Sequence, residues 1–230
     1  MKIEVLPDAD AVAQRAAEFI ADAAREAVAD RGQFTFAVSG GRTPWQMLRA
    51  LGALAMPWDK THLFQVDERV APHGDPDRNL TQIAESLLSL APLARDHVHA
   101  MPVELPDLAA GAARYAQELA AVAGTPPVLD VVHLGLGPDG HTASLVPGDP
   151  ALAVADAAVA LTEPYQGHRR MTLTFPVLDR ARCVLWVVTG AEKGPMLARL
   201  GRGDRTIPAG RVASERAVIL ADAAAAAGLR

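Results

Sequence analysis

The chain has 230 residues, half of them hydrophobic and about a fifth charged, which is typical of a globular protein and excludes a disordered or fibrous one. Its formal net charge is −5, and no run of Lys or Arg is dense enough for a nucleic-acid-binding stripe, so we expect no nucleic-acid partner. The single cysteine, Cys183, excludes a disulfide framework within one chain. Without a recognisable signal peptide or a long apolar span, we expect a cytoplasmic protein with no membrane partner.

Short β-rich runs alternate with Ala-rich helical stretches along the chain. The expected strands lie at 3–6, 34–38, 62–66, 98–102, 129–136, 171–175, 182–188 and 217–220, and helices at 8–30, from about 44, at 79–90, 107–122 and from about 191. This alternation predicts an α/β fold with a mainly parallel, doubly wound open sheet flanked by helices, a Rossmann-like three-layer arrangement. No repeat or long linker interrupts it, so we expect residues 1–230 to form a single domain, with 147–168 and 201–211 as loops.

Ligands of open parallel sheets bind beyond the carboxyl ends of the strands, so polar residues that directly follow apolar runs are the first candidates for a site. The run 34–38 leads into Ser39, Gly40, Gly41, Arg42 and Thr43, and Pro44 is suited to the start of a helix. Two glycines, hydroxyl donors and a helix N-terminus together favour a phosphate-binding loop. The alternative is a tight strand-to-helix turn in which Thr43 caps the helix.

Three charged residues, Asp67, Glu68 and Arg69, follow the run 62–66. Taken alone, they are more typical of a solvated turn. Arg69 is nevertheless suited to grip a phosphate with two parallel hydrogen bonds, and Asp67 to hold sugar hydroxyl groups.

The segment 135–144, GLGPDGHTAS, matches the dinucleotide pattern G-x-G-x-x-G and narrowly misses a P-loop. Asp139 would repel a diphosphate, and His141 cannot supply the permanent charge of a P-loop lysine. Histidine titrates near neutral pH, so a histidine in a glycine-rich loop at a strand end is suited to general-base work. A structural histidine is the alternative.

Cationic residues flank two later strands. Arg169 and Arg170 precede the run 171–175, and Lys193 lies in the expected first turn of a helix, where a cation opposes the helix dipole and calls for a compensating anion. The arginines are as readily explained by solvation. Ser39 and Ser144 are not expected to act as nucleophiles, because neither lies in a G-x-S-x-G elbow.

Five motifs together resemble the 6-phosphogluconolactonases, within the wider group that includes glucosamine-6-phosphate deaminases and ribose-5-phosphate isomerases. They occur in the family's order and approximate spacing: SGGRTP, DER with DRNL, GLGPDGHTASLVPG, RRMTLTFPVL and TGAEKGPML. The resemblance implies a metal-independent hydrolase without a cofactor that opens 6-phosphoglucono-δ-lactone in the pentose phosphate pathway. It implies His141 as general base, Asp139 as the active-site aspartate, Ser39–Thr43, Arg69 and Lys193 as phosphate and substrate contacts, and Arg169 as a mobile arginine.

Several alternatives remain. The deaminases that this group resembles carry a glutamate where this chain has Val146, which disfavours a sugar-phosphate isomerase or deaminase. A non-catalytic sugar-phosphate sensor would bring a DNA-binding segment, for which the chain has no spare length. An NAD-dependent oxidoreductase would bind its cofactor. The histidines show no metal-ligand spacing, so no metal is expected, and the molecule is expected to be a monomer or a weak dimer.

Overall fold

The computed structural model describes residues 1–213 and 215–229, and it contains ten strands in two sheets. The strands are Lys2–Leu6 (β1), Phe34–Val38 (β2), Thr61–Gln65 (β3), Asp67–Arg69 (β4), Val98–His99 (β5), Val131–Leu134 (β6), Val159–Leu161 (β7), Arg170–Leu173 (β8), Cys183–Val188 (β9) and Ala217–Asp222 (β10). Seven of them form one sheet in the order β1-β10-β9-β6-β2-β3-β5, and every neighbouring pair in it is parallel. The predicted parallel sheet is confirmed.

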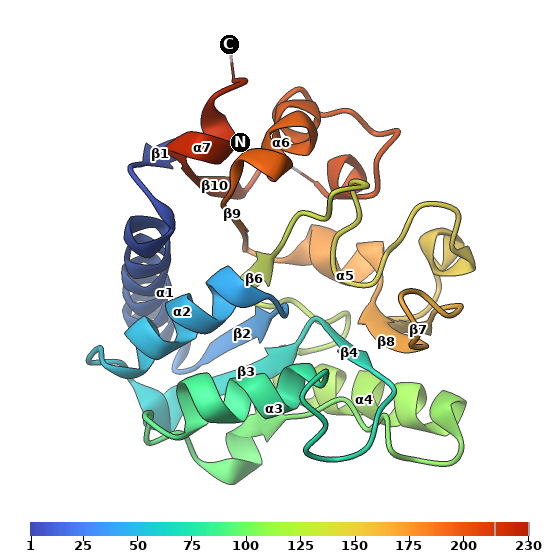
Figure 1. Ribbon diagram of the computed structural model, residues 1–230. Coiled ribbons are helices and arrows are strands. Elements are labelled where there is room, and N and C mark those ends of the chain that lie inside the picture. The colour runs from blue at the N-terminus through green and yellow to red at the C-terminus, as the bar shows by residue number, and fades with distance from the viewer. Residues whose placement is uncertain (214, 230) are drawn as a thin grey trace.

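Helices cover both faces of this sheet (Figure 1). They are Ala9–Arg31 (α1), Arg42–Gly52 (α2), Asn79–Ile83 (α3), Leu108–Ala123 (α4), Phe175–Arg180 (α5), Gly194–Gly201 (α6) and Ala223–Ala226 (α7). A π-helix, Ala84–Leu88, continues α3, and the 3-10 helices are Trp58–Lys60, Arg95–His97, Pro150–Ala153, Ala191–Lys193 and Ala209–Arg211.

Strand residues contribute alternately to two hydrophobic cores, one on each side of the sheet. On β9, Leu185 and Val187 pack with α1 and α2, whereas Val184 and Trp186 pack with α4, α5 and α6. Because successive side chains of a strand point to opposite faces, a strand covered on both sides must be apolar throughout, as β9 is. This is the expected three-layer arrangement.

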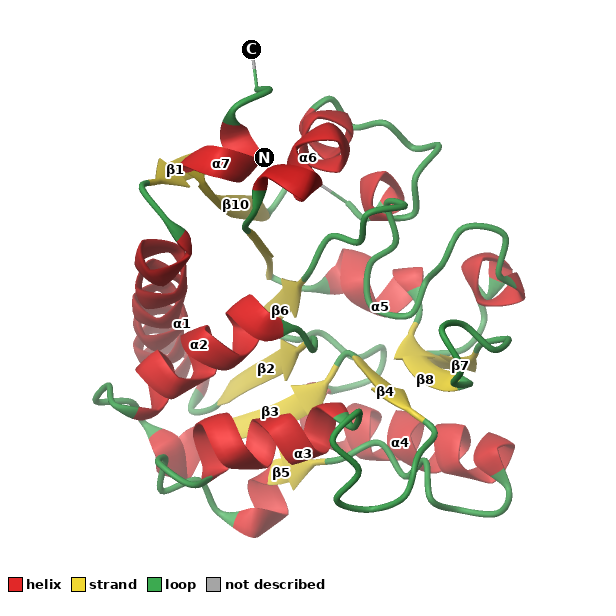
Figure 2. Cartoon of the chain, viewed as in Figure 1, coloured by secondary structure: helices red, strands yellow, loops and turns green. Residues whose placement is uncertain are grey.

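A second, antiparallel sheet in the order β4-β8-β7 was not expected from the sequence (Figure 2). The strand expected at 171–175 corresponds to β8 and belongs to this second sheet. The charged residues after β3 form the short strand β4, and β7 lies within the stretch 147–168, which we expected to be a loop. Asp67 pairs with Thr172 and Arg69 with Arg170 in this ladder. The second sheet therefore brings the DER motif and the RRMTLTFPVL motif side by side.

Two helices differ in detail from their predicted bounds. α2 begins at Arg42, before the proline, and the predicted helix 79–90 is α-helical only to Ile83 before it widens into a π-helix. No helix of the described residues is long and apolar enough to span a membrane. The terminal segment 221–230 is described to residue 229, so Arg230 lies outside the described residues.

Candidate active site

Two adjoining cavities lie at the carboxyl ends of β2, β6 and β9. We name the smaller one the inner cavity and the larger one the outer cavity. The inner cavity has a volume of about 180 Å³ and is lined by Ser39, Gly40, Gly41, Asp67, Arg69, Asn79, Gly135, Leu136, Gly137, Pro138, His141, Ala143, Arg170 and Lys193. The outer cavity, of about 590 Å³, shares Gly40, Gly41, Gly135, Leu136 and Lys193 with it and adds Arg42, Thr43, Thr189 and Asp222 among others. Small-molecule sites commonly measure about 300–1,000 Å³, so the outer cavity alone has room for a sugar phosphate.

The loop after β2 forms the wall common to both cavities. Ser39 is buried: its N–H donates to His133 Nδ1 at 3.3 Å and its hydroxyl donates to the His133 carbonyl at 3.1 Å. The N-cap of α2 is Gly41, with a φ of 132°, and among the described residues no side chain caps this helix. Uncapped N–H groups at a helix N-terminus, with the dipole behind them, attract an anion.

Thr43 does not cap α2, in contrast to the cap considered for it in the sequence. Its hydroxyl instead lies 2.6 Å from the hydroxyl of Thr189, at the end of β9. Gly40 allows close packing, because a Cβ at this position would overlap the side-chain amide of Asn79. The loop is therefore fixed against both of its neighbours, with the helix N-terminus left open.

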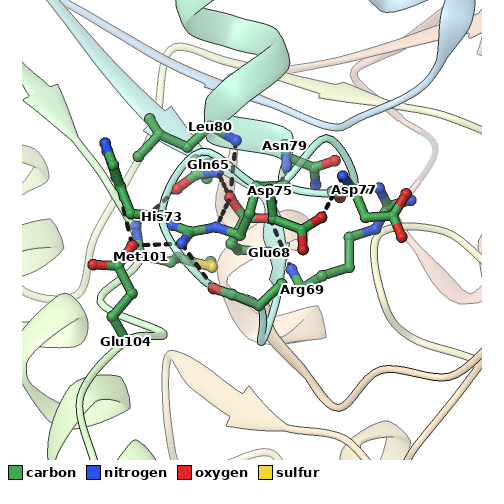
Figure 3. A network of polar contacts seen from close by, with 12 residues as sticks. Gln65, Glu68, Arg69, His73, Asp75, Asp77, Asn79, Leu80, Met101 and Glu104 are labelled. Atoms are coloured by element: carbon green, nitrogen blue, oxygen red, sulfur yellow. Dashed lines mark hydrogen bonds and ion pairs between the residues drawn. The ribbon is translucent and has the colours of Figure 1, made fainter.

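The strand β4 places Asp67 and Arg69 in the inner cavity, while Glu68 points into the protein and is fully buried. Glu68 accepts hydrogen bonds from the backbone N–H groups of Arg69, Asn79 and Leu80 at 2.8, 2.8 and 2.9 Å. It also accepts from Gln65 Nε2 at 2.8 Å (Figure 3). In addition, Glu68 forms an ion pair with Arg78 at 3.1 Å. The carboxylate thus joins β4 to the start of α3, so the charged residues after β3 are not a solvated turn.

Asp67 is nearly buried, and its carboxylate accepts from the Ser144 hydroxyl at 2.6 Å. Burial raises the pKa of Asp67, against the hydrogen bond from Ser144 and the charges of Arg69 and Arg170, which lower it. The hydroxyl groups of Ser39 and Ser144 both donate hydrogen bonds within the protein.

The glycine loop after β6 does not open a helix, which a dinucleotide-binding loop must do. Instead it folds back on itself: the Gly137 N–H donates to the His141 carbonyl at 2.9 Å, and the Thr142 hydroxyl to the Gly135 carbonyl at 3.0 Å. This turn places His141 in the wall of the inner cavity. Gly137 leaves room for the imidazole, because a Cβ there would overlap the ring of His141.

Asp139 and His141 form a close pair. His141 Nδ1 lies 2.5 Å from Asp139 Oδ1, which also accepts from the His141 N–H at 3.1 Å. Burial would raise the pKa of Asp139, but the hydrogen bonds and charge of His141 outweigh burial and lower it. An ionised carboxylate only accepts hydrogen bonds, so Nδ1 carries a proton. In the neutral imidazole this leaves the lone pair on Nε2, which is the tautomer that a proton acceptor requires.

Some of the predicted cationic residues line the cavities and others do not. Lys193, just before α6, lines both cavities, and Arg69 lines the inner one while donating to the Asp77 carbonyl at 2.6 Å. Arg169 lines neither cavity: it is exposed, and its Nε donates to the Thr162 carbonyl at 3.4 Å. Its neighbour Arg170 is buried and lines the inner cavity instead. Arg170 pairs with Arg69 in the ladder between β8 and β4, and side chains of directly paired residues lie on the same face of a sheet, so this pairing takes Arg170 to the cavity that Arg69 also lines.

Our sequence reasoning missed Asn79 and Tyr165. Asn79 lines the inner cavity from the start of α3, and the DRNL motif that contains it was the available signal. Tyr165 lies on the segment between β7 and β8 and donates a hydrogen bond to Asp139 at 3.2 Å. No sequence signal marked Tyr165. Among residues 1–213 and 215–229, no group of three or more His, Cys, Asp or Glu is arranged to hold a metal ion.

Comparison with known proteins gives a consistent result. The family model for glucosamine-6-phosphate isomerases/6-phosphogluconolactonase matches residues 7–220. A 6-phosphogluconolactonase of Mycobacterium tuberculosis is 38% identical to this chain, with 99% of this chain and 98% of the relative covered. One from Nostoc sp. is 38% identical, with 86% of this chain and 84% of that protein covered.

Solved structures agree. The crystal structure of a 6-phosphogluconolactonase from Thermotoga maritima has a TM-score of 0.86 at 28% identity, covering 96% of this chain and 98% of that one. A monomeric glucosamine-6-phosphate deaminase has the same TM-score of 0.86 at 18% identity, with 99% of this chain and 100% of that chain covered, which shows a shared fold only. This chain belongs to the family of glucosamine-6-phosphate isomerases and 6-phosphogluconolactonases.

Proposed function

We propose that the protein hydrolyses 6-phosphoglucono-δ-lactone to 6-phosphogluconate. The observation that carries this proposal is the Asp139–His141 pair in the wall of a cavity that opens onto an uncapped helix N-terminus and Lys193. A proton acceptor beside an anion site suits a substrate with an ester at one end and a phosphate at the other. The similarity to named 6-phosphogluconolactonases over most of the chain supports the same reaction.

The two cavities divide the substrate between them in this proposal. The phosphate group occupies the outer cavity, against the N-terminus of α2, Arg42, Thr43 and Lys193. The lactone ring extends into the inner cavity, where Asp67 holds sugar hydroxyl groups and Arg69 adds positive charge. Binding energy from the remote phosphate then orients the carbonyl carbon for attack.

His141 acts as general base. Its Nε2 takes a proton from water as the water oxygen bonds to the lactone carbonyl carbon, and Asp139 stabilises the imidazolium that forms. The buried guanidinium of Arg170 supplies positive charge in the cavity where the tetrahedral intermediate carries its negative oxygen. The ring C–O bond then breaks, and His141 returns the proton to the departing ring oxygen, which becomes a hydroxyl group. No step requires a cofactor, a metal ion or a covalent intermediate.

Deamination is the closest competing reaction. Where the deaminases that the sequence resembles carry a glutamate, this chain has Val146, which is buried and lines neither cavity. The chain therefore lacks a second carboxylate at this position. Isomerases and deaminases need such a group because they move protons at two atoms. Lactone hydrolysis needs a single base, which favours it here.

The substrate is tested by presenting the purified protein with two sugar phosphates. We expect opening of freshly prepared 6-phosphoglucono-δ-lactone to be accelerated well above its spontaneous rate, and no ammonia from glucosamine 6-phosphate. Ammonia release with unaccelerated lactone opening would assign the chain to the deaminases. Tight binding of 6-phosphogluconate without turnover of either compound would identify a sensor.

A further inference from the structure

Tyr165 contacts the carboxylate that holds His141. The two oxygens of Asp139 have separate partners: Oδ1 lies 2.5 Å from His141 Nδ1, and Oδ2 accepts from the Tyr165 hydroxyl at 3.2 Å. The tyrosine ring also meets the imidazole edge-on, with ring centroids 5.5 Å apart and an interplanar angle of 71°. Tyr165 therefore reaches His141 both through Asp139 and by direct packing.

The backbone around Tyr165 is fixed by a two-residue turn. Tyr165 and His168 exchange backbone hydrogen bonds of 2.9 and 3.3 Å, and between them Gln166 and Gly167 have φ values of 50° and 85°. Two successive left-handed residues are typical of a type I′ hairpin, whose twist matches that of the flanking strands. Such a turn gives the tyrosine a defined direction.

Arg170 also contacts the tyrosine. Its guanidinium carbon lies 5.2 Å from the centre of the Tyr165 ring, and its Nη2 donates to the Tyr165 carbonyl at 3.3 Å. Arg170 itself lines the inner cavity. Tyr165 thus contacts both a cation of the cavity wall and the Asp139–His141 pair.

The phenol is a donor toward Asp139. Burial raises the pKa of Tyr165, as do the charge of Asp139 and the hydrogen bond to it, against an opposing effect of Arg170. Gln166 Nε2 donates to the phenol oxygen at 3.4 Å, which leaves the hydroxyl proton free for Asp139. A contact of 3.2 Å is long for two oxygens, and such bonds commonly tighten when charge develops in the reaction.

We propose that Tyr165 is a positioning residue: by donating to Asp139 Oδ2, it orients the carboxylate toward His141 Nδ1 and disperses part of its negative charge. The role rests on the proposed function, because it acts through the general base assigned there. The other charged residues that line the inner cavity together with His141 are Asp67 and Arg69 of β4, Arg170 of β8 and Lys193 before α6.

Substituting Tyr165→Phe isolates the hydroxyl, because phenylalanine keeps the ring against Arg170 and His141. Without this donor, Asp139 carries more negative charge and stabilises the protonated form of His141 more strongly. On acidification, His141 in the variant is therefore protonated at a higher pH than in the wild type, and activity is lost at that higher pH. We expect kcat to fall roughly 5- to 20-fold, KM to change less than about 2-fold, and the acid limb of the kcat profile to move to higher pH.

The chain's other tyrosine provides a matched control. Tyr115 is buried beneath the sheet, where its hydroxyl donates to the Gln65 carbonyl at 2.8 Å, away from both cavities. Tyr115→Phe removes a buried hydrogen bond and is expected to lower stability. The position of the acid limb should stay as in the wild type, since this hydroxyl does not touch Asp139.

A second readout does not depend on turnover. In the resting protein, the imidazole NMR signals of His141, assigned by their loss in His141→Ala, report the pH at which the ring gains its second proton. We expect this midpoint to be higher in Tyr165→Phe than in the wild type, whether or not the lactone is the substrate. An unmoved NMR midpoint and an unmoved acid limb would overturn the role of Tyr165, whereas a moved midpoint in a protein without lactonase activity would overturn only the proposed function.

Discussion

Gly137 positions the imidazole of His141 because it has no side chain of its own. Between β6 and the cavity, the loop bends so sharply that Cα of Gly137 lies against the imidazole, with no space for a methyl group. The Gly137 N–H meanwhile donates to the His141 carbonyl at 2.9 Å, so the two residues are held together on the backbone side as well. The ring can therefore keep its orientation only with glycine at this position.

Gly137→Ala should displace the imidazole while leaving the phosphate-binding groups in place. A displacement of about 1 Å at a catalytic group can cost 10²-fold in rate, so we expect kcat to fall at least about 10-fold, with 6-phosphogluconate binding nearly unchanged. Steady-state kinetics and calorimetry measure the two quantities. Gly228→Ala is the control, because a methyl group there meets nothing within 4 Å. A Gly137→Ala protein as active as this control would show that the ring tolerates displacement.

The residues that line the cavities were predictable from the sequence where they belong to a motif, and not where long-range packing determines which side chain reaches the cavity. His141 stood out because a titratable side chain in a glycine loop at a strand end has a chemical use. Which of Arg169 and Arg170 reaches the cavity depends on strand register. The position of Tyr165 depends on the direction of a hairpin that the turn residues Gln166 and Gly167 did not indicate. Neither register nor direction is encoded in adjacent residues alone.

At the scale of elements, β4 and α3 are joined through Glu68, a buried carboxylate that faces three backbone N–H groups and the Arg78 side chain. Because β4 carries Asp67 and Arg69, this junction sets the geometry of the inner cavity.

Glu68→Gln places an amide NH₂ group among these donors and leaves Arg78 without its buried partner. Removing one member of a buried ion pair commonly costs about 3–5 kcal/mol, and we expect the free energy of unfolding to fall by this order. Urea denaturation measures it. Glu85→Gln, at an exposed position on the neighbouring π-helix, should change stability by no more than about 0.5 kcal/mol. Equal stabilities of the two variants would mean that the Glu68 network does not hold the junction.

The N-terminus of α2, which follows β2, and Lys193, which follows β9, both line the outer cavity. If they hold the phosphate, Lys193→Ala should weaken 6-phosphogluconate binding by about 10- to 100-fold, the size of a hydrogen bond to a charged group, and should leave binding of unphosphorylated gluconate unaltered. Calorimetry distinguishes the two ligands. Lys60→Ala removes an exposed lysine elsewhere and serves as the control. An equal loss for both ligands would place Lys193 away from the phosphate.

The central strands β2, β6, β9 and β10 were predictable because they are largely apolar runs, and their covered faces require that composition. The second sheet was not, because β4 and β7 have three residues each, and β4 reads as a charged turn. Its charged residues are accommodated in the interior because Glu68 accepts a hydrogen bond from the start of α3 and Asp67 accepts one from Ser144. These are long-range contacts that local propensity cannot report.

For the whole molecule, buried histidines make folding sensitive to acid. His133 lies in the central strand β6, fully buried, and burial lowers its pKa from 6.5 to about 3. Burial together with the neighbouring His97 and His99 likewise lowers the pKa of His62 to about 4. The folded protein keeps these rings neutral while the unfolded chain protonates them below pH 6.5, so stability falls as the pH falls through the window between 6.5 and about 3.

His133→Leu tests this at one position. The variant loses the hydrogen bond from the Ser39 N–H, so it should be less stable at neutral pH, but its stability should fall less steeply with acidification. The difference in slope is expected to approach about 1.4 kcal/mol per pH unit below pH 6, from urea denaturation at a series of pH values. Parallel curves for the two proteins would show that His133 is not buried as a neutral ring.

The central claim concerns one proton acceptor, and its most direct test is the initial rate of 6-phosphoglucono-δ-lactone opening by His141→Ala, corrected for spontaneous hydrolysis. The control is His73→Ala, which removes a histidine whose side chain is 84% exposed and lines neither cavity. We predict a loss of about 10²- to 10⁴-fold for His141→Ala, with 6-phosphogluconate still bound, and wild-type activity for the control. Lactone opening by His141→Ala at the wild-type rate would contradict the account.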